Sequence, residues 1–166
     1  YGSVKVTENT FEKAWGRDIG SLNGWTGCGW TGQPLIVQWD QETKDIMNLF
    51  PEKKAKENLV EVIYATLDGN IYFYDLDDGT YTRNPIRVGM NFKGAGALDP
   101  RGYPIMYVGS GDFLNNKSPR MYMISLIDGS ILYEKNGYDG FSWRAGWSAF
   151  DSSPLVDAET DTLIWP

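Results

Sequence analysis

Hydrophobic and polar positions alternate over short runs through most of the chain, a pattern typical of β-strands rather than helices. The clearest case is residues 64–83, where two Asp-Gly pairs separate three runs rich in Ile, Tyr, Phe and Thr. Asp-Gly is a favoured sequence for tight hairpin turns. The stretch therefore predicts a β-meander of three strands joined by turns at Asp68-Gly69 and Asp78-Gly79.

The same pattern returns further along the chain. Residues 106–133 repeat the order of strands and turns, and Asp128-Gly129 follows Asp78-Gly79 after 50 residues. Repeats of about this length built from antiparallel strands are typical of β-propellers. We therefore expect an all-β protein made of four-stranded antiparallel meanders, each forming one blade of a propeller.

The predicted organisation is one domain that spans residues 1–166. It divides into N-terminal strands at 1–20, a blade at 29–90, a second blade at 91–140 and the start of a third at 141–166. The expected strands are 3–7, 10–15, 34–39, 59–67, 70–76, 80–83, 94–100, 105–109, 121–126 and 131–134.

Two further segments have distinct patterns. The polar stretch 40–58 interrupts the first blade, and we interpret it as an insertion with one short helix at 42–49. The third unit should start at 152–154, and its first strand should pair with a strand near 162–165 across the turn at 157–161.

The expected ring is incomplete, because propellers close with at least about four blades. Residues 10–15 should then form an outer strand without a partner of its own. Unpaired edges favour association. We expect the remaining blades to come from downstream sequence or from a second chain.

Several motifs resemble the quinoprotein-type, or PQQ-like, propeller repeat. Ser153-Pro154-Leu155-Val156 matches its entrance strand, Tyr107-Val108-Gly109-Ser110 its second strand, and Asp68-Gly69 its turn. The closing motif Asp-x-x-Thr-Gly-x-x-x-Trp is degenerate. The first unit keeps Asp75 and Gly79 but has Asp78 and Arg83 at the Thr and Trp places. The second unit keeps Gly129, and its departures are Ser125, Asp128 and Tyr133.

The resemblance implies a non-enzymatic propeller that serves as a binding or scaffold module for a carbohydrate or protein ligand. It also implies an extracytoplasmic or cell-surface location, as in WD40-like and bacterial PQQ-like propellers. The alternative is a fragment of a quinone-dependent dehydrogenase, with PQQ and calcium as cofactors. The chain lacks the adjacent cysteines of several such enzymes, and no residue carries over as a quinone or calcium ligand.

Composition agrees with a globular β protein and limits its chemistry. Among 166 residues, 42% are hydrophobic and 19 are glycine. The formal charge of −7 opposes nucleic-acid binding, and we interpret the basic run at 53–56 as a solvated loop. No apolar run approaches the roughly 20 residues of a membrane span. Without histidine, a Ser-His-Asp triad and histidine metal ligands are excluded.

Candidate sites are few, and we assign no catalytic, cofactor-binding or metal-ligating residue. Residues 75–79 resemble a calcium loop, but the position of Gly79 favours a hairpin turn. Residues 112–116 offer oxygen ligands, or equally an Asx-rich turn. The single cysteine, Cys28, cannot form an intrachain disulfide, and we interpret it as a small packed residue.

The best binding candidates are aromatic residues in two equivalent loops that precede the innermost strands of blades. Indole faces beside a guanidinium can stack on a sugar or a planar ligand. The opposing interpretation is that the indoles wedge neighbouring blades together. The predicted ligand-binding set is Trp25, Trp30, Trp143, Arg144 and Trp147.

Overall fold

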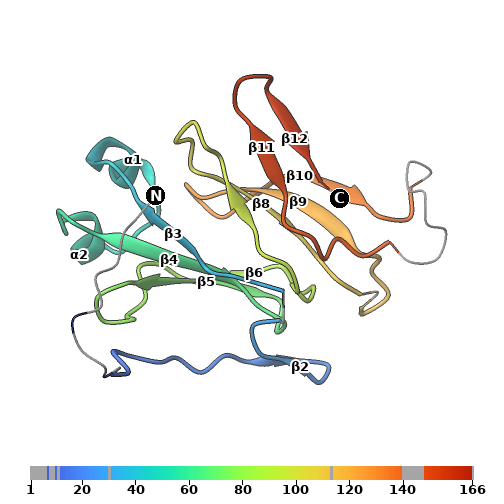
Figure 1. Cartoon of the computed structure of the whole chain (residues 1–166), viewed down its shortest axis with the longest axis horizontal. Coiled ribbons are helices and arrows are strands. Elements are labelled where there is room, and N and C mark those ends of the chain that lie inside the picture. The colour runs from blue at the N-terminus through green and yellow to red at the C-terminus, as the bar shows by residue number, and fades with distance from the viewer. Residues whose placement is uncertain are drawn as a thin grey trace.

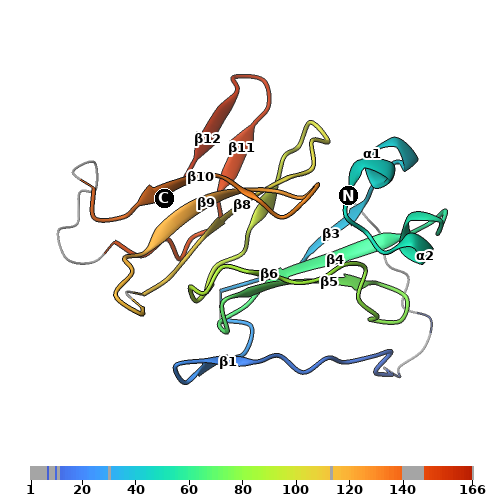
Figure 2. The same cartoon turned by 180° about the vertical axis from the view of Figure 1, so that it is seen from behind.

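The structure is a computed structural model of the chain and describes residues 7, 10, 12–29, 31–112, 114–139 and 148–165. Two four-stranded antiparallel sheets and two small hairpins make up the described strands. The predicted all-β class with antiparallel sheets is confirmed. In both views residues 12–26, called here the N-terminal segment, lie at the bottom and the C-terminal hairpin lies at the top, with the two large sheets between them (Figures 1 and 2).

Sheet 1 is a meander in which consecutive strands are neighbours. Its strands, in spatial order, are β3 (Leu35–Gln38), β4 (Val60–Ala65), β5 (Asn70–Asp75) and β6 (Ile86–Arg87). The turn at Asp68-Gly69 joins β4 to β5, and Gly69 there has a φ of 80°, which glycine adopts without strain. Strand β3 alternates between half-buried residues, Leu35 and Val37, and exposed ones, Ile36 and Gln38.

The predicted fourth strand at 80–83 is wrong. Tyr81 forms only an isolated bridge with Tyr74, and the fourth strand begins later, at Ile86. The cause lies in two consecutive side chains, Thr82 and Arg83, which both turn inward and are both fully buried. A regular strand sends neighbouring side chains to opposite faces, so this arrangement ends the alternation.

The predicted insertion between the first two strands of sheet 1 is confirmed, but it contains two short helices instead of one. Helix α1 (Gln41–Ile46) begins after Asp40, whose side chain accepts from the Thr43 amide at 2.7 Å. Helix α2 (Pro51–Lys54) has a proline in its first turn, a position where the missing N–H costs nothing.

Sheet 2 repeats the construction of sheet 1 and confirms the expected strands of the second unit. Its strands, in spatial order, are β7 (Ala97–Leu98), β8 (Ile105–Gly109), β9 (Arg120–Ser125) and β10 (Ile131–Asn136). Gly79 and Gly129 both have positive φ, of 66° and 82°, at the corresponding turns. The hairpin interpretation of residues 75–79 is therefore confirmed.

The C-terminal hairpin agrees with the prediction. Strand β11 (Leu155–Asp157) pairs antiparallel with β12 (Thr162–Ile164), with Val156 opposite Leu163. Asp157 stabilises the connecting turn by accepting from the Glu159 amide at 3.0 Å.

The N-terminal region differs from the prediction. Residues 12–20 form no strand, so the expected strand at 10–15 is wrong over its described part. Instead, Trp15 donates from Nε1 to the Leu76 carbonyl at 2.8 Å and packs against Tyr74. Packing of this half-buried indole on sheet 1 takes the place of strand pairing. The glycine-rich stretch at 20–32 begins with a small hairpin, β1 (Ser21–Leu22) with β2 (Trp25–Thr26), which the sequence did not predict. Of the expected strand at 3–7, only Thr7 is among the described residues.

The main core lies between sheets 1 and 2. Its fully buried members include Ile63 and Phe73 from sheet 1 and Val108 and Ile124 from sheet 2.

A buried polar group accompanies this core. Glu61 accepts from Thr82, Arg83 and the indole of Trp39, and the Arg83 guanidinium lies 4.2 Å from the Phe73 ring centroid. Arg83 also donates to the Leu126 carbonyl of the second unit, so one side chain joins the two sheets.

Candidate functional site

Of the predicted aromatic set, only Trp25 belongs to the described residues. Trp30, Trp143, Arg144 and Trp147 lie outside them. Trp25 is on β2, and its ring centroid is 5.1 Å from the Lys93 ammonium nitrogen. This distance is within the range of a cation–π contact. The one described residue of the predicted site therefore contacts Lys93, a residue that the sequence analysis did not single out.

Lys93 lies where the opening segments of all three units meet. Thr31 and Gly94 form a parallel bridge, and the Thr31 hydroxyl donates to the Lys93 carbonyl at 2.8 Å. A Cβ on Gly94 would come within 2.4 Å of the Asp151 carbonyl oxygen, so only glycine allows this approach. The three segments that precede β3, β7 and β11 are thus held side by side.

The charges at this junction are largely compensated. The buried Lys93 ammonium is 2.8 Å from Asp112 Oδ2 and 3.9 Å from Asp151 Oδ2. Burial raises the pKa of Asp151, and its Oδ1 has no hydrogen-bond partner among the described residues. Because Lys93 is already neutralised by two carboxylates, the junction works as a charged clamp between loops rather than as a free cationic site.

The structure also describes two further candidates, Cys28 and most of residues 112–116. Cys28 is exposed, which contradicts its interpretation as a packed residue. Asp112 pairs with Lys93, and the nearby Asn115 and Asn116 adopt positive φ angles of 51° and 62° in a turn. This geometry favours the turn interpretation of 112–116. Among the described residues there is no cluster of three or more His, Cys, Asp or Glu that could hold a metal ion.

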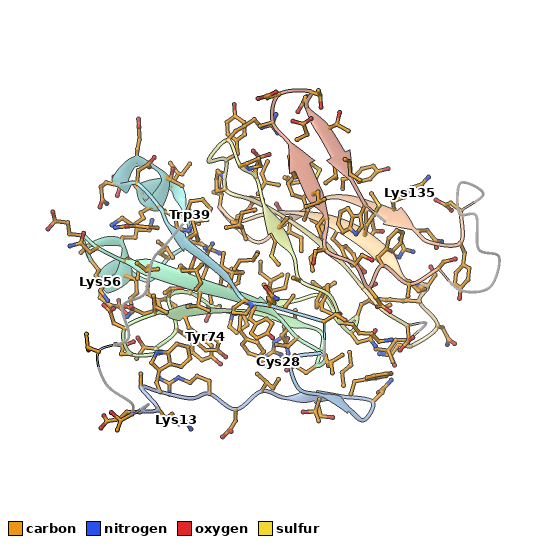
Figure 3. All side chains as sticks on the ribbon, in the orientation of Figure 1. Lys13, Cys28, Trp39, Lys56, Tyr74 and Lys135 are labelled. Carbon is orange, nitrogen blue, oxygen red and sulfur yellow. The ribbon has the colours of Figure 1, made fainter. Side chains whose placement is uncertain are left out.

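A second region of interest is the outer face of sheet 1, the face turned away from sheet 2. Its aromatic rings stack in a row. Trp15 and Tyr74 are 5.9 Å apart between ring centroids, Tyr72 and Tyr74 are 5.8 Å apart, and Tyr74 and Tyr81 are 5.2 Å apart. Figure 3 shows Tyr74 and Cys28 in the layer between sheet 1 and the N-terminal segment.

The space in this layer is only partly filled. A hollow of about 270 Å³ lies under the N-terminal segment, between Trp15, Ile19 and the aromatic row. Burial, followed by the neighbouring Tyr81, raises the pKa of the Tyr74 hydroxyl well above its usual range. That hydroxyl makes no hydrogen bond of ordinary geometry to any described residue. The outer face therefore has space and a buried hydroxyl that the described residues leave without a hydrogen bond of ordinary geometry.

A more polar cluster borders the aromatic row. Burial alone would raise the pKa of Asp68, but hydrogen bonds from Thr66, Tyr72 and Asn70 hold it below its usual value. The Tyr72 hydroxyl donates to Asp68 Oδ2 at 2.6 Å, and the Gly20 amide donates to the same atom at 2.9 Å. Asp68 thus fixes the turn, one tyrosine and the N-terminal segment together.

Comparison with known proteins yields no assignment: no protein-family model matches the chain, and no curated protein sequence matches it.

In the part of the chain that the structure describes, no helix is long and apolar enough to cross a membrane.

Proposed function

We propose that this chain is part of a PQQ-like β-propeller that acts as a non-enzymatic binding or scaffold module and that takes up a further sheet on the outer face of sheet 1. The proposal combines the repeat motifs with the two four-stranded meanders. By the same resemblance, its place of action is outside the cytoplasm or on the cell surface.

The observation that carries the proposal is a correspondence between the two sheets. The Asp-Gly turns and the strand registers align sheet 1 with sheet 2, so that the pair Val62–Tyr74 corresponds to Met106–Ile124. Residues directly opposite in an antiparallel pair point to the same face. The outer face of sheet 1 thus corresponds to the face by which sheet 2 packs on sheet 1. From sheet 1 to sheet 2, Ile36 corresponds to Leu98, Val62 to Met106, Tyr64 to Val108, Tyr72 to Tyr122 and Tyr74 to Ile124.

The two faces differ in how well they are covered. In sheet 2, Met106, Val108 and Ile124 are fully buried by the contact with sheet 1, and Leu98 packs against the same core. In sheet 1, Val62, Tyr72 and Tyr74 are buried under the N-terminal segment. Ile36 is 59% exposed and Tyr64 is only half-buried. The same kind of face is therefore covered by a sheet in one unit, and in the other by an irregular segment that leaves Ile36 exposed.

The contact between the sheets is of the head-to-tail kind. Sheet 1 contributes the face turned toward the core, whereas sheet 2 contributes the face that corresponds to the outer face of sheet 1. Repetition of this contact therefore produces a ring or an open arc. At the other end of the array, Leu155 and Ile164 lie opposite each other on the C-terminal hairpin and are both more than half exposed. Both ends thus present apolar surface for a further sheet, supplied by the same polypeptide or by a second chain.

The test is the association state of the 166-residue chain, measured by analytical ultracentrifugation over a range of concentrations. We expect association that increases with concentration and that Ile36→Arg abolishes. Ile46→Arg is the matched control, because Ile46 on α1 has the same exposed fraction of 59% but lies outside the outer face. A chain that stays monomeric, or two variants that behave alike, would overturn the docking role.

The non-enzymatic part has its own test. PQQ and calcium are added to the chain, and absorbance and dye reduction are followed. We expect neither a bound chromophore nor reduction; both signals together would favour the quinone-dependent dehydrogenase instead.

A further inference from the structure

A second hollow lies at the outer end of sheet 1, beyond the aromatic row. It measures about 400 Å³, within the roughly 300–1,000 Å³ of typical ligand clefts. Two tyrosines, two asparagines, a proline and an arginine form its walls, namely Asn70, Tyr72, Tyr81, Asn84, Pro85 and Arg87.

The position of this hollow is repeated in sheet 2. A smaller hollow of about 190 Å³ lies against Tyr122, Ile131, Arg120 and Glu134. Fifty residues earlier in the sequence, the counterparts of these four residues are Tyr72, Tyr81, Asn70 and Asn84, which line the sheet 1 hollow. Val88, from the segment after β6, closes the sheet 2 hollow from the side of sheet 1. A hollow therefore persists here even where a neighbouring sheet has docked, so the site is compatible with the proposed assembly.

The chemistry of the two hollows is different. In sheet 2, Arg120 donates to Glu134 at 2.7 Å, so the charges on its walls neutralise each other. In sheet 1, asparagines replace both members of that pair, and a cation, Arg87, comes from β6. No carboxylate of the described residues lies within ion-pair distance of Arg87. The sheet 1 hollow thus keeps a positive charge available to a ligand.

The aromatic wall is a pre-formed platform. Tyr81 is 41% exposed, and its ring is held by stacking on Tyr74 at 5.2 Å and on Tyr72 at 6.4 Å between centroids. The Tyr72 hydroxyl is fixed by Asp68. A ring held in this way offers a flat apolar surface at little cost in side-chain entropy.

The polar wall adds hydrogen-bonding groups around the platform. The Asn70 amide nitrogen donates to Asp68 at 2.8 Å, and no described residue donates to its amide oxygen. The Asn84 side chain makes no hydrogen bond to the described residues and is exposed beside Arg87. Amides that surround an aromatic face suit a ligand with an apolar ring face and several hydroxyl groups, which is the form of a sugar.

We propose that this hollow, between Tyr81 and Arg87, binds an acidic sugar residue of the hexuronate type. One face of the sugar ring lies on Tyr81, the hydroxyl groups meet Asn70 and Asn84, and the carboxylate pairs with the Arg87 guanidinium. Arginine suits this last contact because its planar fork matches the two oxygens of a carboxylate.

The experiment titrates the full chain with methyl glucuronide, and with methyl glucoside as the neutral counterpart, by isothermal calorimetry and by NMR. We expect the glucuronide to bind about tenfold more tightly, since a hydrogen bond to a charged group is stronger than one between neutral groups. Arg87→Gln should remove this preference, and Tyr81→Ala should weaken both ligands. Lys117→Gln, in the sheet 2 hollow, and Tyr133→Ala, on exposed β10, are controls that should change nothing.

Each other outcome counts against the site. Equal binding of the two sugars, binding of neither, or an Arg87→Gln variant that keeps the preference would overturn it, as would loss of binding in Lys117→Gln. Ile36→Arg, the variant that should block sheet docking, should leave glucuronide binding intact. The sugar site and the assembly can therefore fail separately.

Discussion

The Lys53 ammonium lies 2.7 Å from Asp75 Oδ2 and joins the helical insertion to sheet 1. Asp75 is fully buried at the end of β5, and Lys53 is buried on α2. Lys56 reaches the same carboxylate at 2.8 Å and extends the cluster to Asp77. The basic run at 53–56, interpreted from the sequence as a solvated loop, is therefore an anchor.

Loss of the Asp75 charge should destabilise the chain strongly. In Asp75→Asn the buried Lys53 loses its main counter-charge, and breaking a buried pair in this way costs about 3 kcal/mol. The measurement is urea unfolding followed by circular dichroism. Asp77→Asn is the control, because Asp77 is 70% exposed and surface pairs contribute about 1 kcal/mol or less. Equal losses in the two variants would contradict the anchoring role.

Acid should remove stability through two buried carboxylates. Hydrogen bonds from Arg101 lower the pKa of Asp99 to about 2, and although burial opposes the change, Lys53 and Lys56 lower that of Asp75. Since both groups hold protons less tightly when folded, their contribution is complete above the unfolded pKa of about 3.9 and disappears as pH falls through the folded values. Unfolding free energies measured from pH 6 downwards should therefore fall between about pH 4 and pH 2. Asp75→Asn should flatten part of this decline; an unchanged profile would contradict the assignment.

Gly79 should be sensitive to substitution for two separate reasons. Its φ of 66° disfavours any other residue, and a Cβ there would lie 2.6 Å from the Trp15 ring. Gly89 has a similar φ of 75° but open space around it. Gly89→Ala should cost about 1 kcal/mol from backbone strain alone, and Gly79→Ala should cost more and shift Trp fluorescence. Equal costs and unchanged fluorescence would show that the indole does not pack against the turn.

The buried pair between Arg83 and Glu61 predicts non-additive mutations. Arg83→Met leaves the Glu61 carboxylate buried with only neutral partners, at a cost of about 3–5 kcal/mol. Adding Glu61→Gln removes the unpaired charge, so the double variant should be more stable than the Arg83→Met single variant. Thermal unfolding of the wild type, the two single variants and the double variant checks this, and simple additivity would argue against a coupled pair.

Local patterns in the sequence were sufficient to predict most of the strands. The Asp-Gly turns place β4, β5 and β9 correctly, and the turn at 157–161 places the C-terminal hairpin, because each hairpin is specified by residues close together in the chain. The fourth strand of sheet 1 was predicted in the wrong place because Thr82 and Arg83 turn inward to donate hydrogen bonds to Glu61, which lies about 20 residues away in the sequence. The strand expected around Trp15 is absent for a similar reason, because the indole of Trp15 donates a hydrogen bond to the carbonyl of Leu76, which lies far away in the sequence.

The candidate site was less accessible to sequence reasoning. The structure brings Trp25 to Lys93, but Lys93 had no local motif to mark it. The hollow at Tyr81 was missed although the repeat contained a usable signal. Comparing the units at a shift of 50 residues shows that an asparagine pair replaces Arg120 and Glu134, a change in charge that the strand pattern alone does not require.

The correspondence between the two sheets also bears on how such a chain grows over evolutionary time. The strands of sheet 1 all lie within residues 35–87 and those of sheet 2 within residues 97–136. Among the described residues, the isolated β-bridge between the segments that open the two units is that of Thr31 with Gly94. A duplication of one segment would therefore carry a whole meander together with both of its packing faces. The number of units is then set by the angle at which neighbouring sheets pack, and a gene can add or lose a unit without redesigning those that remain.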